Sequence, residues 1–201
     1  MCKKLIWTSI DPIFHNLAHL NGNDEVYYHL EYSKGGYEKS SANQWVINYK
    51  KDIEFRGETS WQYKQKAIKD FAELISNHPP KCNDFALLAG ATSKHRKSPL
   101  FDSRNEDTLR LVHDITGIPI SFNLETVSDF EPLHHQPGFR KPSMIYGRYR
   151  FIPFKTVPEA VYIVDDVITS GVHFVVWKNL IQKVHPGIEV RGLYLARTVA
   201  E

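Results

Sequence analysis

Residues 161–171 constrain the fold of this 201-residue chain more than any other segment. Their sequence, VYIVDDVITSG, is an apolar run, two adjacent aspartates, two apolar residues, and then a threonine, a serine and a glycine. A short apolar run without alternation is typical of a strand that is covered on both faces. Apolar residues at helical spacing follow the glycine. The segment therefore predicts a buried strand, a short loop and a helix.

The rest of the C-terminal two thirds repeats this alternation of strands and helices. Capping-box patterns at Thr59–Gln62 and Ser103–Glu106 predict helix starts, and Gly117 is typical of a helix end. Alternating strands and helices predict an α/β fold, with a central, mostly parallel sheet and helices on both faces. The expected strands are residues 85–90, 118–122, 160–164 and 188–196, and the expected helices begin near residues 59, 103 and 172.

The N-terminal part of the chain is rich in aromatic residues and less regular. Residues 25–32 favour a strand, while residues 43–51 fit a short helix or a strand equally well. We therefore expect residues 1–58 to form a hood-like region and residues 59–201 to form the core, together in one compact domain. Residues 123–158, with five prolines, are the least regular part of that core.

Composition narrows the function classes. With 25 Lys and Arg against 23 Asp and Glu, the net charge of +2 gives no global basic field for nucleic acid. Two cysteines, Cys2 and Cys82, cannot build a disulfide framework or a four-cysteine zinc site. No apolar run approaches the ~20 residues of a membrane-spanning helix. The N-terminus also lacks the long apolar stretch of a signal peptide. We expect a reduced, cytoplasmic protein with no membrane partner.

The loop after the two aspartates suggests a ligand. Two hydroxyls and a glycine allow backbone N–H groups to surround a phosphate, and the dipole of the following helix favours the same anion. Carboxylates would repel a phosphate, but they accept hydrogen bonds from vicinal sugar hydroxyls. A ribose 5-phosphate satisfies both halves of the loop. The alternative is a purely structural acidic turn that caps the helix.

VYIVDDVITSG resembles the motif with which type I phosphoribosyltransferases bind 5-phosphoribosyl 1-diphosphate (PRPP). Within that family, the pattern is most similar to ComF-like proteins. The likeness rests on the basic loop at residues 93–97, the Gly147–Phe151 stretch and the C-terminal Leu195–Thr198. The chain departs from the ComF-like pattern because it lacks the cysteines of an N-terminal zinc finger. The resemblance implies a type I phosphoribosyltransferase fold.

The resemblance also implies roles for individual residues. Asp165 and Asp166 would hold the ribose hydroxyls, and Lys94 with Arg96 would face the pyrophosphate that leaves. Mg²⁺ would reach the site on PRPP itself, whereas Lys97 and Arg104 are expected at the surface. The 5-phosphate loop would comprise Val167, Ile168, Thr169, Ser170, Gly171, Val172 and His173, and the pyrophosphate loop Ala91, Thr92, Ser93 and Lys94.

Two functions remain open at this point. The first is an enzyme that transfers phosphoribose from PRPP to a nitrogenous acceptor. The second is a non-transferase effector or regulator, such as a retron-type anti-phage effector or a ComF-like DNA-uptake protein. Such a protein would use a PRPP or phosphoribosyl-nucleotide site and bind protein or nucleic acid, for which the basic stretch at residues 140–150 is the candidate surface. A homo-oligomer is compatible with both.

Overall fold

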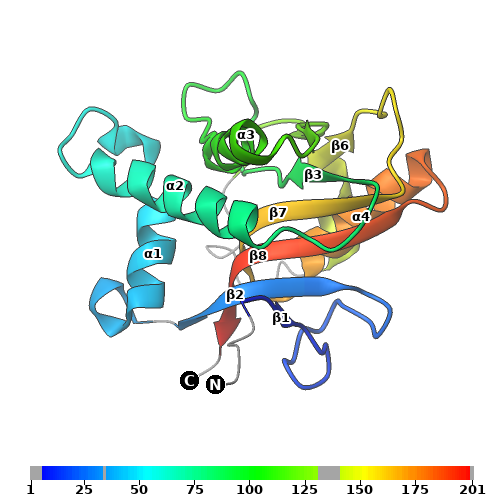
Figure 1. The fold of residues 1–201 in the computed structure, drawn as a ribbon, viewed down its shortest axis with the longest axis horizontal. Helices are drawn as coiled ribbons and strands as arrows, with labels where there is room; N and C mark the ends of the chain where they lie inside the picture. Colours follow the sequence, from blue (N-terminus) through cyan, green and yellow to red (C-terminus); the bar gives the residue numbers. More distant parts are fainter. Residues whose placement is uncertain (1–5, 34, 131–140, 200–201) are drawn as a thin grey trace.

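The computed structural model describes residues 6–33, 35–130 and 141–199. The described residues form a six-stranded sheet in the order β1-β2-β8-β7-β3-β4 (Figure 1). Only β1 is antiparallel to its neighbour; the other pairs are parallel, which confirms the α/β class with a mostly parallel sheet. The strands are β1 (Thr8–Ser9), β2 (Val26–Ser33), β3 (Phe85–Ala89), β4 (Ile120–Ser121), β7 (Ala160–Ile168) and β8 (Glu189–Val199).

Helices cover both faces of this sheet. The helix α4 (Val172–Val184) contributes Phe174, Trp177 and other apolar side chains to one core. The helices α1 (Ser41–Tyr49), α2 (Trp61–Asn77) and α3 (Arg104–Thr116) contribute to the second core, on the other face. None of the described helices is long and apolar enough to cross a membrane.

Helix and strand positions agree with the sequence patterns, but some details differ. The ambiguous residues 43–51 lie mostly in α1, and the strand expected at residues 118–122 is shortened to β4. The two predicted capping boxes are wrong. The N-cap of α2 is Ser60 rather than Thr59, and neither Ser60 nor Ser103 makes a side-chain hydrogen bond to its helix start. The Ser103 hydroxyl instead donates to Asp107 on the next turn, at 2.7 Å. Gly117 ends α3 in the left-handed conformation, as predicted.

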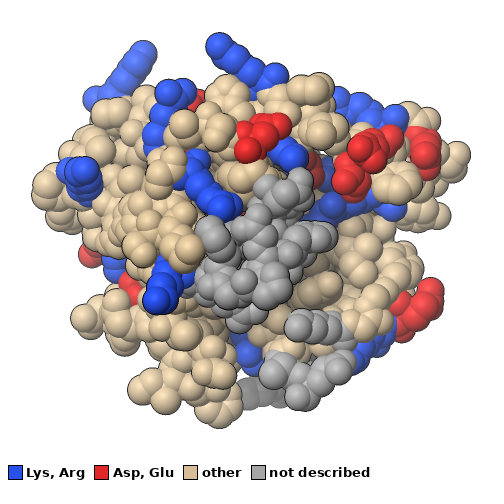
Figure 2. All heavy atoms as spheres, turned by 180° about the vertical axis from the view of Figure 1, so that it is seen from behind, with Lys and Arg blue, Asp and Glu red and all other residues tan. Residues whose placement is uncertain are grey.

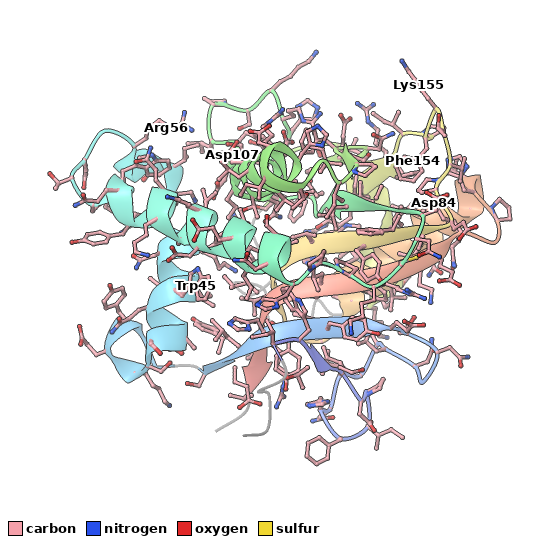
Figure 3. All side chains as sticks on the ribbon, viewed as in Figure 1. Trp45, Arg56, Asp84, Asp107, Phe154 and Lys155 are labelled. Atoms are coloured by element: carbon pink, nitrogen blue, oxygen red, sulfur yellow. The ribbon has the colours of Figure 1, made fainter. Side chains whose placement is uncertain are left out.

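The N-terminal region is built into the same layered fold. β2 lies inside the sheet and pairs with β8 from Val26 opposite Gly192 to Ser33 opposite Val199. Trp45 of α1 (Figure 3) donates its indole N–H to the backbone oxygen of Ala67 in α2, at 3.1 Å. The sheet and its helical layer therefore continue across the boundary expected at residue 58.

A small second sheet occupies the irregular segment. It pairs β5 (Leu124–Thr126) with β6 (Tyr149–Phe151) in antiparallel register. Two single-turn helices, η4 (Pro142–Met144) and η5 (Tyr146–Arg148), precede β6. Tyr149 and Phe151 pack into the core that contains α4. This sheet thus lies close to the carboxyl ends of the central strands, where Thr126 bonds the backbone of the loop after β3.

Candidate functional site

The carboxyl ends of β3 and β7 form the point at which the chain changes direction across the sheet. From β3 the chain crosses through α3 to β4, and from β7 it crosses through α4 to β8 on the opposite side. Ligands in open α/β sheets bind at such switch points. A cavity of about 20 Å³ lies there, enough for about one water molecule. Its walls come from β3, the loop after it, the start of α3 and β5.

Strand β7 is longer than the apolar run predicted. It continues through both aspartates to Ile168, and Asp165 pairs with Tyr194 of β8. On the other side β3 stops at Ala89, opposite Val164. The aspartates therefore follow the point where β7 loses its β3 neighbour, and they lie within the strand rather than in a loop beyond it. Both side chains are buried, in the part of β7 that extends beyond the end of β3.

Asp166 is held by two cations and a backbone amide. Arg104 donates to Asp166 Oδ2 from Nε at 3.1 Å and from Nη2 at 2.5 Å. Lys50 Nζ lies 3.5 Å from Oδ1, and Val167 N–H donates to the same oxygen at 2.6 Å. Burial acts to raise the pKa of Asp166, but Lys50 and Arg104 outweigh it and hold that pKa well below its usual range. Asp166 is therefore a carboxylate at neutral pH.

Arg104 was expected at the surface, and that expectation is wrong. Its side chain is 13 % exposed and bridges Asp166 to Asp102, whose Oδ2 accepts from Nη1 at 2.6 Å. Asp102 Oδ2 also accepts from Lys64 Nζ at 2.7 Å, and Lys64 is itself buried. Sequence reasoning missed these partners because they come from the helical layer. The sequence signal that could have placed Arg104 near the site is its position at the start of α3, directly after the loop that follows β3.

Asp165 has a different environment. Its Oδ1 accepts from Asn105 Nδ2 at 2.9 Å, and Asn105 also donates to the backbone oxygen of Gly90. A Cβ on Gly90 would lie 2.9 Å from Asp165 Cβ and 3.2 Å from the Trp177 ring, so only glycine fits there. Burial, and then the neighbouring charge of Asp166, raise the pKa of Asp165 to about 7. Asp165 thus takes up or releases a proton near neutral pH.

The loop after β7 leads directly into α4. Gly171 precedes the helix with φ 79°, a left-handed conformation that favours glycine. Among the described residues no side chain caps this helix start, and its first turn contains no acidic residue. The first backbone N–H groups of α4 therefore have no side-chain partner at the N-cap, and such groups at a helix start favour an anion. The Thr169 and Thr198 hydroxyls share a hydrogen bond of 2.9 Å.

The N-terminal segment lies against this loop. His19 N–H donates to the backbone oxygen of Ser170 at 3.2 Å. Leu20 packs so closely on Gly171 that a Cβ there would lie 2.7 Å from it. Asp24, near the end of the same segment, pairs with Lys178 of α4 at 2.6 Å. Residues 19–24 thus brace the loop and the helix that follows it.

His173 lies in the first turn of α4 and points into the protein. Its ring stacks on Trp177, with centroids 5.4 Å apart, and meets Tyr149 edge-on. Its Nε2 is buried without a hydrogen-bond partner in the described structure. Burial lowers the pKa of His173 to about 4, so the ring is neutral at pH 7. Ile168 and Val172, which flank the loop, also pack in this core and offer only their backbone.

The loop after β3 brings Ala91, Thr92 and Lys94 to the cavity. Ser93 accepts Phe130 N–H through its backbone oxygen. Arg96 also lines the cavity, but it is bound to Glu106 at 2.6 Å and lies 3.4 Å from Glu125. The structure therefore brings the predicted pyrophosphate loop to the same switch point as the two aspartates.

The basic stretch at residues 140–150 is partly neutralised. Arg150 donates to Glu125 twice, at 2.9 and 2.7 Å, and the guanidinium of Arg148 lies over the Phe130 ring. Arg140 lies outside the described residues, as does Cys2. On the face shown in Figure 2, basic side chains occupy several separate places with acidic ones among them. The described part of this face carries no single basic patch.

No protein-family model matches this chain, and a search of curated proteins finds none with significant similarity. The likeness of residues 161–171 to a PRPP-binding motif therefore rests on the motif and on its setting between a strand and a helix.

Proposed function

We propose that the chain binds PRPP at the carboxyl ends of β3 and β7 and transfers its phosphoribosyl group to a nitrogenous acceptor, with release of pyrophosphate. One observation carries this proposal. The buried carboxyl pair of β7 is followed, after one short loop, by the start of α4 with no side-chain cap among the described residues. Carboxylates suit sugar hydroxyls and uncapped amides suit a phosphate, so the two features together fit a ribose 5-phosphate.

The three parts of PRPP have separate places in this arrangement. The 5-phosphate would lie on the amides that follow Thr169 and Ser170. The ribose hydroxyls would face Asp165 and Asp166. The diphosphate would occupy the cavity beside Lys94, at the end of β3.

Mg²⁺ would be held mainly by the diphosphate oxygens, because it prefers phosphate and water to an all-protein cage. Among the described residues no group of three or more His, Cys, Asp or Glu side chains is placed to hold a metal ion. The carboxylates around the cavity are engaged by cations, as Glu106 is by Arg96. The donor set therefore fits a metal that arrives with the ligand. The metal would neutralise charge that develops on the leaving group.

The reaction follows from these places. The acceptor nitrogen attacks the anomeric carbon and forms the C–N bond, while the C–O bond to the diphosphate breaks and its electron pair leaves with pyrophosphate. The proton lost by the acceptor nitrogen passes to a base or to water. Positive charge develops on the ribose and negative charge on the diphosphate. Carboxylates near the ribose and Lys94 near the diphosphate complement that separation.

The cavity must open for the ligand to enter. Its volume of about 20 Å³ is sufficient for about one water molecule and too small for a diphosphate. The loop between β3 and α3, residues 90–103, lines much of this cavity and lies outside the sheet. Binding would therefore be accompanied by an outward movement of that loop.

The second candidate is a regulator that binds PRPP or a phosphoribosyl nucleotide without turnover. The specific observation in its favour is the ion pair between Arg104 and Asp166, which occupies the carboxylate that a ribose would need. This candidate predicts that the ligand stabilises the protein while no pyrophosphate is released.

Calorimetry of PRPP binding in the presence of Mg²⁺ tests the site. We expect wild type to bind and the Asp165→Asn/Asp166→Asn variant not to bind. Asp114→Asn is a matched control because Asp114 is an exposed carboxylate on α3, outside the site. Circular dichroism confirms that each variant is folded. Unchanged PRPP affinity in the double variant would contradict the proposal, as would the absence of binding to wild type.

A screen of nitrogenous bases for pyrophosphate release then separates the two candidates. Release that depends on an acceptor supports transfer. Ligand binding and thermal stabilisation without release across the screen support the regulator.

A further inference from the structure

Five side chains of alternating charge form a row of ion pairs that runs from the interior to the surface. In order they are Lys64, Asp102, Arg104, Asp166 and Lys50, with successive N–O distances of 2.7, 2.6, 2.5 and 3.5 Å. The side chain of Lys64 is 2 % exposed and that of Lys50 is 39 % exposed, so the row of ion pairs begins in the core and ends at solvent. Arg104 stands at its centre and contacts both carboxylates.

Such a row of ion pairs contributes little to the stability of the fold. Removing charges from water costs about as much as a buried pair returns, and apolar replacements of similar volume are often equally stable. Its position is more informative, because the two Arg104 bonds to Asp166 Oδ2 occupy one oxygen of the carboxylate that would receive a ribose hydroxyl. Arg104 therefore competes with the ligand for Asp166.

Arg104 also lies next to the residues that line the cavity. Asn105, which follows it in α3, and Asp102, which accepts from its Nη1, both line that space. A turn of the guanidinium away from Asp166 would thus bring it toward the place proposed for the diphosphate. A planar guanidinium can bind a phosphate through two parallel hydrogen bonds.

The charge of the cavity indicates that a further cation is needed. Its lining includes the cations Lys94 and Arg96, but also three carboxylates, those of Asp102, Glu106 and Glu125. A diphosphate would meet more negative than positive side chains there. Arg104, released from Asp166, would bring the cations to three and so equal the number of carboxylates.

We infer that Arg104 is a latch that the ligand opens: it bonds Asp166 in the free protein and moves to the diphosphate when a ribose hydroxyl replaces it on Asp166. The inference rests on the proposed PRPP site. It assigns to that site a residue, Arg104, that couples the ribose position at Asp166 to the diphosphate position in the cavity. Ribose 5-phosphate, which lacks the diphosphate, must displace Arg104 without offering it a new partner. Its affinity is therefore reduced by the fraction of protein that is latched.

The test compares three probes, ribose 5-phosphate, Mg²⁺-pyrophosphate and Mg²⁺-PRPP, on wild type, Arg104→Gln and Arg104→Lys. We expect Arg104→Gln to bind ribose 5-phosphate at least threefold more tightly than wild type and pyrophosphate at least tenfold more weakly. Arg104→Lys retains the positive charge but cannot make two parallel hydrogen bonds. Its affinities for both probes should lie between those of wild type and Arg104→Gln. Arg110→Gln is the control, since Arg110 is an exposed arginine on the same helix.

The outcomes separate the latch from the site. Wild type that binds PRPP, with variants that weaken all three probes equally or not at all, overturns the latch and leaves the proposed function intact. Wild type that binds none of the probes overturns both. If Arg104→Gln does not fold, the NMR signal of the Arg104 Nε–H in wild type gives the answer. The latch requires that signal to shift when PRPP saturates the site; an Nε–H unmoved by saturating PRPP excludes it.

Discussion

Asp165 and Asp166 are consecutive in β7, yet their surroundings drive their pKa values in opposite directions. Side chains alternate between the faces of a strand, so the two carboxyls meet different partners. Asp165 bonds the neutral Asn105, and burial raises its pKa to about 7. Asp166 bonds Arg104 and lies near Lys50, which hold its pKa well below the usual range. One carboxyl is thus poised to titrate, and its neighbour stays charged.

This asymmetry predicts different costs for two similar substitutions. Asp166→Asn removes the charge that compensates Arg104 in a buried pair and should lower the free energy of unfolding by about 3 kcal/mol at pH 7. Asp165→Asn keeps the acceptor for Asn105 and removes a charge that burial disfavours, so it should not lower the free energy of unfolding at pH 7. Urea unfolding of both variants measures the difference. Equal losses would contradict it.

The pH dependence of stability should contain two opposing contributions between pH 4 and 7. Folded Asp165 keeps its proton to about pH 7, whereas the unfolded group loses it near 3.8, so this contribution falls as pH rises. Folded His173 is neutral down to about pH 4, whereas the unfolded ring binds a proton below 6.5, so its contribution rises with pH. The two contributions therefore oppose each other in wild type.

Single variants separate these contributions. Asp165→Asn should leave the contribution of His173, so that the free energy of unfolding increases between pH 4 and 6.5 by up to about 1.4 kcal/mol per pH unit relative to wild type. His173→Gln should show the reverse slope. Unfolding free energies at several pH values measure both, and two variants that change with pH in parallel would rule out the assignment.

Leu20 and Gly171 should be energetically coupled. Gly171→Ala introduces a Cβ that meets Leu20 at 2.7 Å and also strains a left-handed backbone. Gly187→Ala is the control, because Gly187 has a similar φ of 88° with nothing within 4 Å of its Cβ, and it should cost only about 1 kcal/mol. Gly171→Ala should cost at least twice as much. A Leu20→Ala background should recover the excess, and additive losses would show that the contact carries no strain.

Gly90 should be required for the position of Asp165. Gly90→Ala places a methyl group 2.9 Å from Asp165 Cβ, so the two strand ends must separate and PRPP affinity should fall at least tenfold. Gly22→Ala meets nothing within 4 Å and should leave binding unchanged. Calorimetry compares the two, and a Gly90→Ala variant with wild-type affinity would show that this packing does not position the carboxyl.

Local patterns predicted much of the fold, because they report which face of an element is buried. The apolar runs gave β3 and the start of β7, and Gly117 marked the end of α3 through its left-handed conformation. The end of β7 was missed, since two aspartates are unusual in a buried strand. They are tolerated there because Arg104 and Asn105 supply the bonds that water would otherwise provide.

The sequence by itself determined the alternation of strands and helices and the grouping of two carboxylates, two hydroxyls and a glycine in one short segment. Only the tertiary structure decided which side chains those groups meet. Arg104 and Asp166 lie 62 positions apart, and nothing in the spacing of either residue indicates the other. They meet because β3 and β7 are neighbours, which places the start of α3 over the carboxyl end of β7. Periodicity records burial, whereas the partner of a buried charge depends on which ends of the chain the sheet brings together.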